Sequence, residues 1–258
     1  MRMDKRFLKL QMIWLMAVIA FATTASAQIG KHRDDFAVGV NGGVMLSTVG
    51  FKPSVTQDQH VGITGGVSVR YVCEKYYTMI CSVLAEFNYA QMGWKERILN
   101  TQDAPVINPL TGIAEEYSRS INYVQLPVFA HLAWGREVSG MNFFFQAGPQ
   151  LGWYLGESTS TNFDVNQPYV EGRSNNIVKQ YSMKVENSFD YGIAAGLGVE
   201  WSNPKMGHFL IEGRYYYGLG NIYGASKRDY FGISNHNGIS IKLTYLFDLK
   251  TTKDADRR

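Results

Sequence analysis

The stretch Tyr191-Gly-Ile-Ala-Ala-Gly-Leu-Gly-Val-Glu-Trp201 alternates apolar residues with small or charged ones. Side chains of a β-strand point alternately to opposite faces, so this stretch has one apolar face and one that is small or polar. Residues 36–46 and 239–247 follow the same two-residue period. The repeat therefore predicts strands of a sheet with one face in apolar surroundings.

Eight such strands are predicted, at residues 36–47, 62–72, 78–92, 117–134, 141–155, 189–201, 208–220 and 237–247. The connections at 73–77, 135–140 and 202–207 are short and rich in turn-forming residues, whereas those at 48–61, 95–116, 156–188 and 221–236 are long and polar. Outer-membrane barrels have short periplasmic turns and long external loops. The sequence thus predicts an all-β fold, a single antiparallel up-and-down transmembrane β-barrel of eight strands.

The N-terminus has the pattern of a secretory signal. Basic residues precede an apolar run at 10–22, and small residues end in Ala25-Ser-Ala27. The run is shorter than the roughly 20 residues that a transmembrane helix needs, and its end fits an A-x-A cleavage site. We expect residues 1–27 to be a signal peptide and 28–258 an exported outer-membrane domain, with the barrel at 36–247 and a short periplasmic tail at 248–258.

The charge of the chain gives no sign of a nucleic-acid partner. Residues 1–27 carry four of the 25 basic and one of the 22 acidic residues, which leaves 21 of each in the remainder. The basic excess thus belongs to the export signal, and no sustained basic patch follows it.

The face opposite the apolar one carries many charged and amide side chains. A soluble sandwich buries such a set only at a high cost in free energy, whereas an eight-stranded barrel has a lumen just wide enough for side chains to fill. We expect a closed lumen in which the basic residues neutralise the acidic ones. The predicted lumenal polar network consists of Arg70, Glu86, Gln125, Asp190, Glu200, Glu212, Arg214 and Lys242.

Aromatic residues fall at strand ends on the apolar face. Amphipathic rings favour the headgroup level of a membrane, so these residues predict two aromatic girdles. The alternative is that they are scattered core residues of a soluble barrel. The predicted girdle consists of Phe36, Tyr71, Trp134, Phe143, Trp153, Trp201, Phe209, Tyr217, Tyr245 and Phe247.

Two pairs of residues lead to predictions about local structure. Pro127 and Pro149 fall almost opposite each other in neighbouring strands, where a missing N–H removes a ladder hydrogen bond, so a bulge or gap is expected. Cys73 and Cys81 flank a tight turn, and an oxidising compartment could join them. The sequence leaves this disulfide open, because hairpin register decides whether the two Cα atoms are close enough.

No catalytic motif is present: the chain has no G-x-S-x-G, H-E-x-x-H or P-loop pattern. His60 beside Asp58, and His236 near Asp229, fall in predicted external loops, where a catalytic base needs an acid or nucleophile within hydrogen-bond reach. Solvated loop residues are the simpler interpretation. We expect no enzymatic activity, cofactor or metal.

Several motifs occur in a fixed order along the chain. Asn122-Tyr-Val-Gln-Leu-Pro127 resembles N-Y-L-x-x-P, Ala147-Gly-Pro-Gln-Leu-Gly-Trp153 resembles G-P-x-x-G-Y, and Arg214-Tyr-Tyr-Tyr-Gly-Leu-Gly-Asn-Ile222 is similar to R-Y-x-x-G-L-x-N-I. Residues 190–200 match D-x-G-x-x-x-G-x-G-x-E, and residues 86–89 are similar to E-L-x-Y. The series is similar to that of PorT-like outer-membrane β-barrel proteins. The resemblance implies a small barrel in a Gram-negative outer membrane and a link to type IX protein secretion. Val124 and Gln125 depart from the family pattern.

The functional expectation is a non-enzymatic integral outer-membrane barrel that contacts lipids and lipopolysaccharide. It would bind other envelope or secretion proteins through external loops or periplasmic turns, or serve as a structural factor of the envelope. One alternative is an accessory component of type IX-like secretion or a narrow transport channel. Another is a soluble, lipocalin-like ligand-binding barrel, which requires an apolar lumen and a charged exterior.

Overall fold

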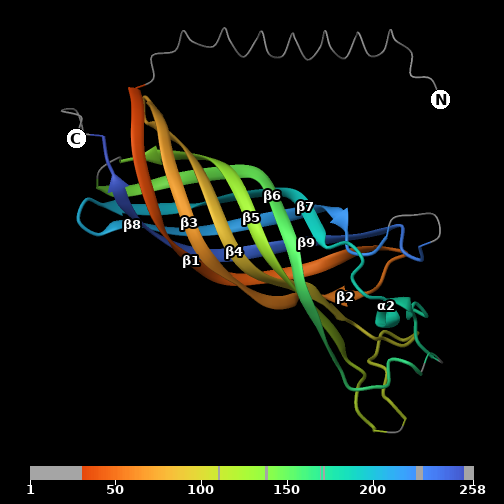
Figure 1. Ribbon diagram of the computed structural model, residues 1–258. Coiled ribbons are helices and arrows are strands. Elements are labelled where there is room, and N and C mark those ends of the chain that lie inside the picture. Colours follow the sequence, from red (N-terminus) through yellow and green to blue (C-terminus); the bar gives the residue numbers. More distant parts are fainter. Residues whose placement is uncertain are drawn as a thin grey trace, which may run out of the picture.

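The computed structural model describes residues 31–252 except 110, 137–138, 169, 171 and 225–228. Strands dominate this part of the chain, with one short helix in a connection (Figure 1). The elements are β1 (Lys31–Lys52), β2 (Gln57–Asp58), β3 (His60–Tyr76), β4 (Met79–Glu96), β5 (Tyr117–Gly135), β6 (Gly140–Thr161), α2 (Lys179–Ser182), β7 (Phe189–Asn203), β8 (Gly207–Asn221) and β9 (Ile233–Lys250).

The eight long strands form a closed ring. Each pairs antiparallel with the next long strand in the sequence, and β9 pairs antiparallel with β1 from Lys52↔Ile233 to Phe36↔Lys250. The two-residue strand β2 adds to β4 alone. Closure leaves the barrel wall without a free edge where all eight strands are present. The prediction of an eight-stranded up-and-down barrel is confirmed.

The strands are longer than predicted. β1 and β6 each contain 22 residues, whereas a tilted strand needs about 9–11 to cross a membrane. Residues 48–52, 156–161 and 233–236, predicted as loop, are strand, and β9 continues through the first three residues of the predicted tail. These stretches lack the apolar outward residues on which the prediction depended. The wall therefore extends well beyond a membrane-thick band.

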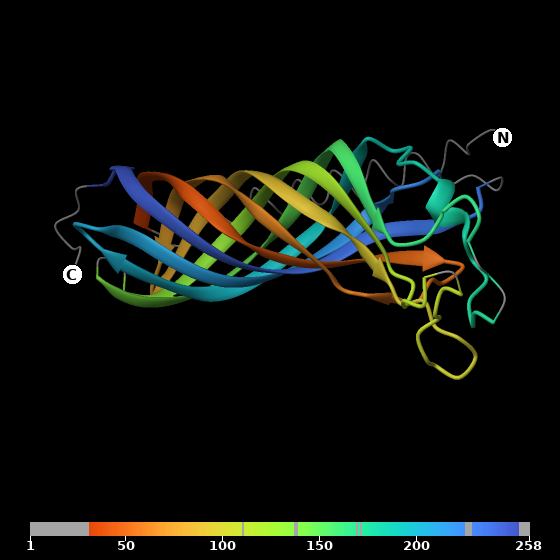
Figure 2. The ribbon, with the colours of Figure 1, turned by 90° about the horizontal axis from the view of Figure 1, so that it is seen from below.

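The two ends of the barrel differ. The tight connections β3–β4, β5–β6 and β7–β8 lie at one end, called the turn end, with the start of β1 and the end of β9 (Figure 2). The long connections, β2 and α2 gather at the opposite end, called the loop end (Figures 1 and 2). No helix in the described residues has the length and apolar character needed to span a bilayer.

The outer face of the wall is apolar over its middle. Side chains here point away from the lumen at every second position and are largely exposed, as a surface in contact with lipid requires. Exposed members of this band include Val40, Val44, Ile63, Val67, Val83, Phe87, Val128, Phe145, Ile193, Leu197, Ile211, Ile239, Ile241 and Leu243.

The two strand prolines interrupt the ladder as predicted. Pairing of β5 with β6 stops after Pro127↔Gln150 and resumes at Ala130↔Ala147. Pairing of β4 with β5 also skips Leu126 and Pro127. Register is the same on both sides of each interruption, so the feature is a gap and not a bulge.

The seam between β1 and β9 depends on a close backbone approach at Gly43. A Cβ atom there would lie 2.1 Å from the carbonyl oxygen of Ile241, whereas at Gly42 the nearest atom would be 3.9 Å away. We therefore expect Gly43→Val to lower the free energy of unfolding by about 1–3 kcal/mol, the usual cost of overpacking. Gly42→Val is the matched control and should change it little. Urea unfolding in lipid vesicles measures both, and equal stabilities would show that the seam tolerates a side chain.

Candidate functional site

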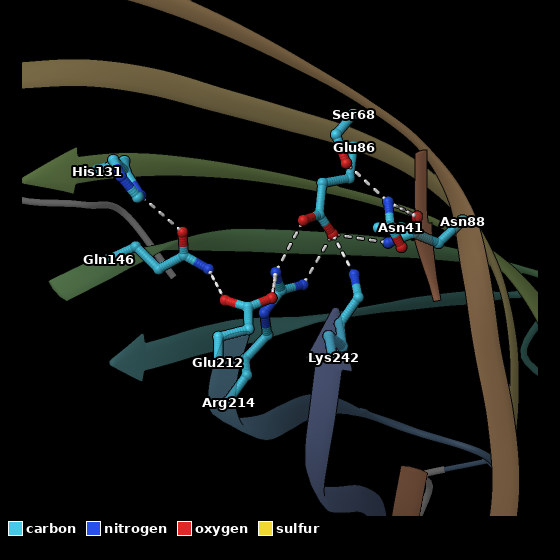
Figure 3. Close-up of polar contacts among 9 residues, drawn as sticks. All are labelled: Asn41, Ser68, Glu86, Asn88, His131, Gln146, Glu212, Arg214 and Lys242. Carbon is cyan, nitrogen blue, oxygen red and sulfur yellow. Dashed lines mark hydrogen bonds and ion pairs between the residues drawn. The ribbon is translucent and has the colours of Figure 1, made fainter. Parts of the chain in front are cut away.

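The lumen contains a central ion-pair cluster at Glu86 on β4. Both Arg214 terminal nitrogens donate to its carboxylate at 2.9 Å, and Lys242 Nζ donates at 2.6 Å (Figure 3). Asn88 Nδ2 donates to the same carboxylate at 2.7 Å. Asn41 joins the cluster by donating to Asn88 Oδ1 at 2.9 Å. Glu86 thus receives four donors while being almost fully buried.

The cluster continues across the lumen through Glu212. Arg214 donates to Glu212 at 2.5 Å, and Gln146 also donates to this carboxylate. Gln146 Oε1 lies 3.0 Å from His131 Nδ1, and the Arg214 guanidinium lies 4.4 Å from the centre of the Phe129 ring. Two cations and two carboxylates therefore balance each other across the barrel (Figure 3).

A second cluster lies nearer the turn end, around Glu200. Its carboxylate accepts from Arg70 at 2.8 Å and lies 2.7 Å from His208 Nδ1. His208 Nε2 lies 3.2 Å from Asp248, so this ring joins β8 to the end of β9. The cluster borders a polar cavity of about 180 Å³, which is also lined by Asn142.

Two predicted network residues lie apart from the ion pairs. Asp190 accepts from Tyr216 at 2.6 Å and has no cationic partner among the described residues, so the expectation that a basic residue neutralises it is wrong. Gln125 donates to the Met92 sulfur at 3.1 Å. Both side chains face the lumen, and Gln125 lies directly opposite Asn88 of the central cluster in the pairing of β4 with β5. The inner face also carries buried apolar residues, so the lumen is mixed in character: Ala37, Leu84, Phe129, Phe144, Leu210 and Leu246.

Polarity changes at the loop end of the barrel. We call this region the crown. It comprises residues 48–52, β2, residues 91–96, 117–122 and 155–161 of β4, β5 and β6, and the described residues of the connections 97–116, 162–188 and 222–232. Its outward residues on β4 and β5 are polar: Gln91, Lys95, Ser118, Ser120 and Asn122. Its inward residues form an apolar core: Val49, Phe51, Met92, Trp94, Tyr117, Ile121, Tyr181, Ile222, Tyr223 and Phe231.

Aromatic rings in this core pack directly against one another. Phe51 contacts Trp94 at 5.2 Å and Phe231 at 4.8 Å between ring centres, and Tyr117 contacts Tyr181 at 4.6 Å. All five rings are buried. The loop end of the lumen is therefore covered by a packed apolar layer.

Buried arginines hold the long connections onto this layer. Arg119 on β5 donates to the carbonyl oxygen of Met183 at 2.6 Å and to the hydroxyl of Tyr223 at 2.9 Å. Arg173 in the connection pairs with Glu115 at 2.5 Å. The Tyr181 hydroxyl donates to Glu96 at 2.7 Å. Burial raises the pKa of Tyr181, and the Glu96 carboxylate raises it further, so this donor keeps its proton.

The histidines considered as catalytic bases have no acid beside them in the described residues. His60 Nδ1 lies 3.4 Å from the Ser118 hydroxyl, and Asp58 pairs with Arg97 instead. His236 lies in β9 and is completely buried, with the Tyr123 hydroxyl 3.1 Å from its Nε2, so its placement in a loop was wrong. Within the described chain, no set of three His, Cys, Asp or Glu side chains could hold a metal ion.

Cys73 and Cys81 are free thiols in the structure. Pairing of β3 with β4 shifts between Val72 and Glu74, so Cys73 is the extra residue of a bulge and Cys81 lies opposite Glu74. The disulfide left open by the sequence is therefore not formed here.

The predicted girdle residues occupy the two ends of the apolar band. Tyr71, Trp134, Phe143, Trp201, Phe209, Tyr245 and Phe247 are exposed near the turn end, and Trp153 and Tyr217 are exposed farther toward the loop end. The rings of Trp201, Phe209 and Tyr245 pack against one another in a row across three strands. Phe36 is half-buried. Their role at the headgroup level remains a prediction.

Sequence reasoning missed the polar partners that complete the clusters. Asn41, Asn88 and Ser68 have the same inward parity as the predicted residues, and Asn41 Nδ2 donates to Ser68 Oγ at 2.8 Å. Their inward position in the two-residue alternation of each strand was thus the available signal. It could not identify which inward side chains meet, because they come from strands far apart in the sequence.

Because the central cluster forms around Glu86, we expect the stability of the barrel to depend strongly on this residue. Glu86→Ala leaves Lys242 buried without its carboxylate, and breaking a buried pair in this way costs about 3–5 kcal/mol of unfolding free energy. The double variant Glu86→Ala/Lys242→Met removes the stranded charge and should recover about 1 kcal/mol or more of that loss. Urea titration in lipid vesicles tests both variants. A single variant within about 1 kcal/mol of the wild type would contradict this account of the network.

One protein-family model and several solved structures are similar to this chain. A family model described as "Outer membrane protein beta-barrel domain" matches residues 26–224. No curated protein matches the chain. Similar solved structures include Neisserial surface protein A, at 11% identity over 82% of this chain and 97% of that one with a TM-score of 0.39. Ail, the attachment invasion locus protein of Yersinia pestis, has 12% identity over 82% and 98%, with a TM-score of 0.34.

The outer membrane protein OprG from Pseudomonas aeruginosa has 13% identity over 84% of this chain and 98% of that one, with a TM-score of 0.38. The family model is the decisive finding, since it spans well over half of the chain. The chain therefore belongs to the family of outer-membrane proteins with a β-barrel domain, and its location is the outer membrane.

Proposed function

We propose that this protein is a closed, non-enzymatic outer-membrane barrel that holds a folded external crown for binding other proteins of the cell envelope. The observation that carries the proposal is the change of polarity along the wall. Below the crown the outside is apolar, and within the crown the outside is polar over an apolar core. A wall of this kind anchors in lipid and, beyond the membrane, folds as a water-soluble module.

The connection at residues 97–116 forms an arm on this crown. Val106 N donates to Ile98 O at 3.1 Å and Glu115 N donates to Val106 O at 2.9 Å, so the arm has backbone pairing of its own. Ile107 and Ile113 nevertheless remain 53% and 61% exposed. Apolar side chains held in water by a folded loop are typical of contact sites for another protein.

The arm gives the proposal a direct test. Ile107→Glu/Ile113→Glu should reduce by more than about tenfold the yield of specific crosslinks between this protein and its envelope partners in intact cells. Thr101→Glu, in the exposed part of the same arm, adds charge without removing an apolar contact and serves as the control. Crosslinking from the crown, followed by mass spectrometry, measures the yield. Equal crosslink patterns in both variants would overturn recognition by the arm.

Transport through the lumen is the alternative that the geometry favours least. The central ion pairs lie in the lumen and the aromatic layer of the crown covers its loop end, and their side chains are nearly all buried. We expect no single-channel conductance above the background of a planar bilayer. Stable openings abolished by Gly196→Arg, whose side chain would enter the lumen beside Arg214, would support a channel instead. The soluble lipocalin-like alternative is wrong, because the chain belongs to an outer-membrane family.

A narrower proposal places the chain among PorT-like proteins, with an accessory part in type IX-like secretion. The ordered motifs support it, and four of them have structural roles here: Pro127 and Pro149 open the ladder, Arg214 organises the central cluster, and Asp190 accepts from Tyr216. In this version the partners bind at the turn end or the crown. Contact of the apolar band with lipids and lipopolysaccharide is part of both proposals.

A further inference from the structure

The wall of the crown has an open strand edge on β6. Pairing of β6 with β7 ends at Trp153↔Phe189, whereas pairing with β5 continues to Thr161↔Tyr117. Residues 155–161 therefore have a strand neighbour on one side only. In Figure 1, β6 runs on toward the loop end beyond the start of β7.

Two hydrogen bonds fix which backbone groups face this edge. Tyr154 N donates to Ser188 O on the β7 side at 2.8 Å, and Asn162 N donates to Glu116 O on the β5 side at 3.4 Å. Backbone groups of an antiparallel strand point alternately to its two sides. Counting back from Asn162, the N–H and C=O groups of Thr159 and Glu157 point away from β5. In the part of the chain that the structure describes, no backbone group pairs with them there.

Other seams of the crown are closed by polar side chains that replace a missing strand. Gln57 bonds both Val49 N and Val49 O, at 3.0 and 2.6 Å. The Ser47 hydroxyl bonds Gly93 N at 2.9 Å. Asn187 donates to the carbonyl oxygen of Asn221 at 2.8 Å. The edge at residues 155–161 has no such closure in the described chain.

The edge also lacks two of the residue types that keep natural edge strands from pairing. Residues 155–161 contain neither proline nor lysine. The carboxylate at Glu157 lies 3.7 Å from Arg119 Nε on the inner side, and Ser158, Thr159 and Ser160 are exposed. A strand left open beside small hydroxyl side chains is accessible to another backbone.

We propose that the β6 edge binds an extended segment of a partner polypeptide, which adds to the wall of the crown as a further antiparallel strand. Only a polypeptide offers donors and acceptors at the two-residue spacing of Glu157 and Thr159, and strand addition to an exposed edge is a general mode of peptide recognition. This inference rests on the proposed role of the crown in protein binding, and it names the surface and the conformation of the partner.

The sequence of β5 provides a defined probe. Residues 117–124, Tyr-Ser-Arg-Ser-Ile-Asn-Tyr-Val, already pair antiparallel with the other side of the same β6 segment. A synthetic peptide of this sequence should bind the full-length protein in lipid nanodiscs and slow hydrogen exchange of the Glu157 and Thr159 amides by about tenfold or more, the effect of a hydrogen bond worth about 1 kcal/mol or slightly more. The amides of Ser158 and Ser160, which face β5, are the internal control.

Two variants at Thr159 distinguish the contribution of the backbone N–H from that of the side chain. Thr159→Pro removes the N–H that faces the edge, at a position where proline is tolerated in edge strands, whereas Thr159→Val removes only the hydroxyl that accepts from Arg119 at 3.3 Å. Peptide binding should weaken by about tenfold in the proline variant and remain near wild type in the valine variant. Equal binding by both variants, or peptide binding without protection of the two amides, would overturn the proposal.

The outcomes also distinguish this inference from the proposed role of the crown in protein binding. Protection of the same amides without peptide, rising with protein concentration, would show pairing of two copies and overturn the assignment to a different partner. If the arm variant loses crosslinks and the peptide does not protect the Glu157 and Thr159 amides, the crown remains a binding surface. The β6 edge is then refuted as a binding site. Peptide binding with the stated protection, together with an unaffected arm variant, would support the edge and refute the arm.

Discussion

Pairing of β1 with β9 is the constraint on which the rest of the structure depends. Hydrocarbon offers no hydrogen-bond partner, so a sheet can span a membrane only when its first and last strands pair. Closure at eight strands limits the interior to a width that side chains fill. Gly43 permits the close approach of Ile241 at this seam, and Lys242, the next residue along β9, enters the lumen and reaches Glu86. Closure of the wall and filling of the lumen are therefore coupled through adjacent residues.

The interior is organised in layers along the barrel axis. Glu200 with Arg70 and His208 lies near the turn end, Glu86 with Arg214 and Lys242 lies in the middle, and the aromatic layer of Phe51 and Trp94 covers the loop end. The first two layers are ionic and lie behind the apolar band of the outer face. The third is apolar and lies behind a polar outer face. The polarity of each layer is thus opposite to that of the outer face beside it, because the wall is one strand thick and its side chains alternate between the two faces.

The sequence predicted the closed barrel, the short and long connections and the inward parity of all eight network residues, because these follow from a two-residue period and from loop length. It failed where contacts between residues far apart in the chain decide which side chains are partners and where strands extend. Asp190 has an inward position like Glu86, but only the three-dimensional arrangement shows that Tyr216 and not a cation is its partner. Residues 156–161 were predicted as a loop because the crown reverses the polarity pattern on which strand prediction relied. His236 was predicted in a loop because residues 233–236 lack the apolar outward residues of the barrel wall. The bulge at Cys73 likewise depends on register and not on composition.

The register shift between Asn122 and Tyr123 leaves Leu155 as an extra residue on β6. A one-residue insertion in a strand exchanges the inner and outer faces of everything beyond it. Tyr154 faces the lumen before the shift, and Glu157 and Thr159 face Arg119 after it. The two parts of β6 therefore have independent facing patterns, one matched to lipid and one to water. Substitutions beyond Leu155 can alter the external end of the protein during evolution without changing which side chains meet the membrane.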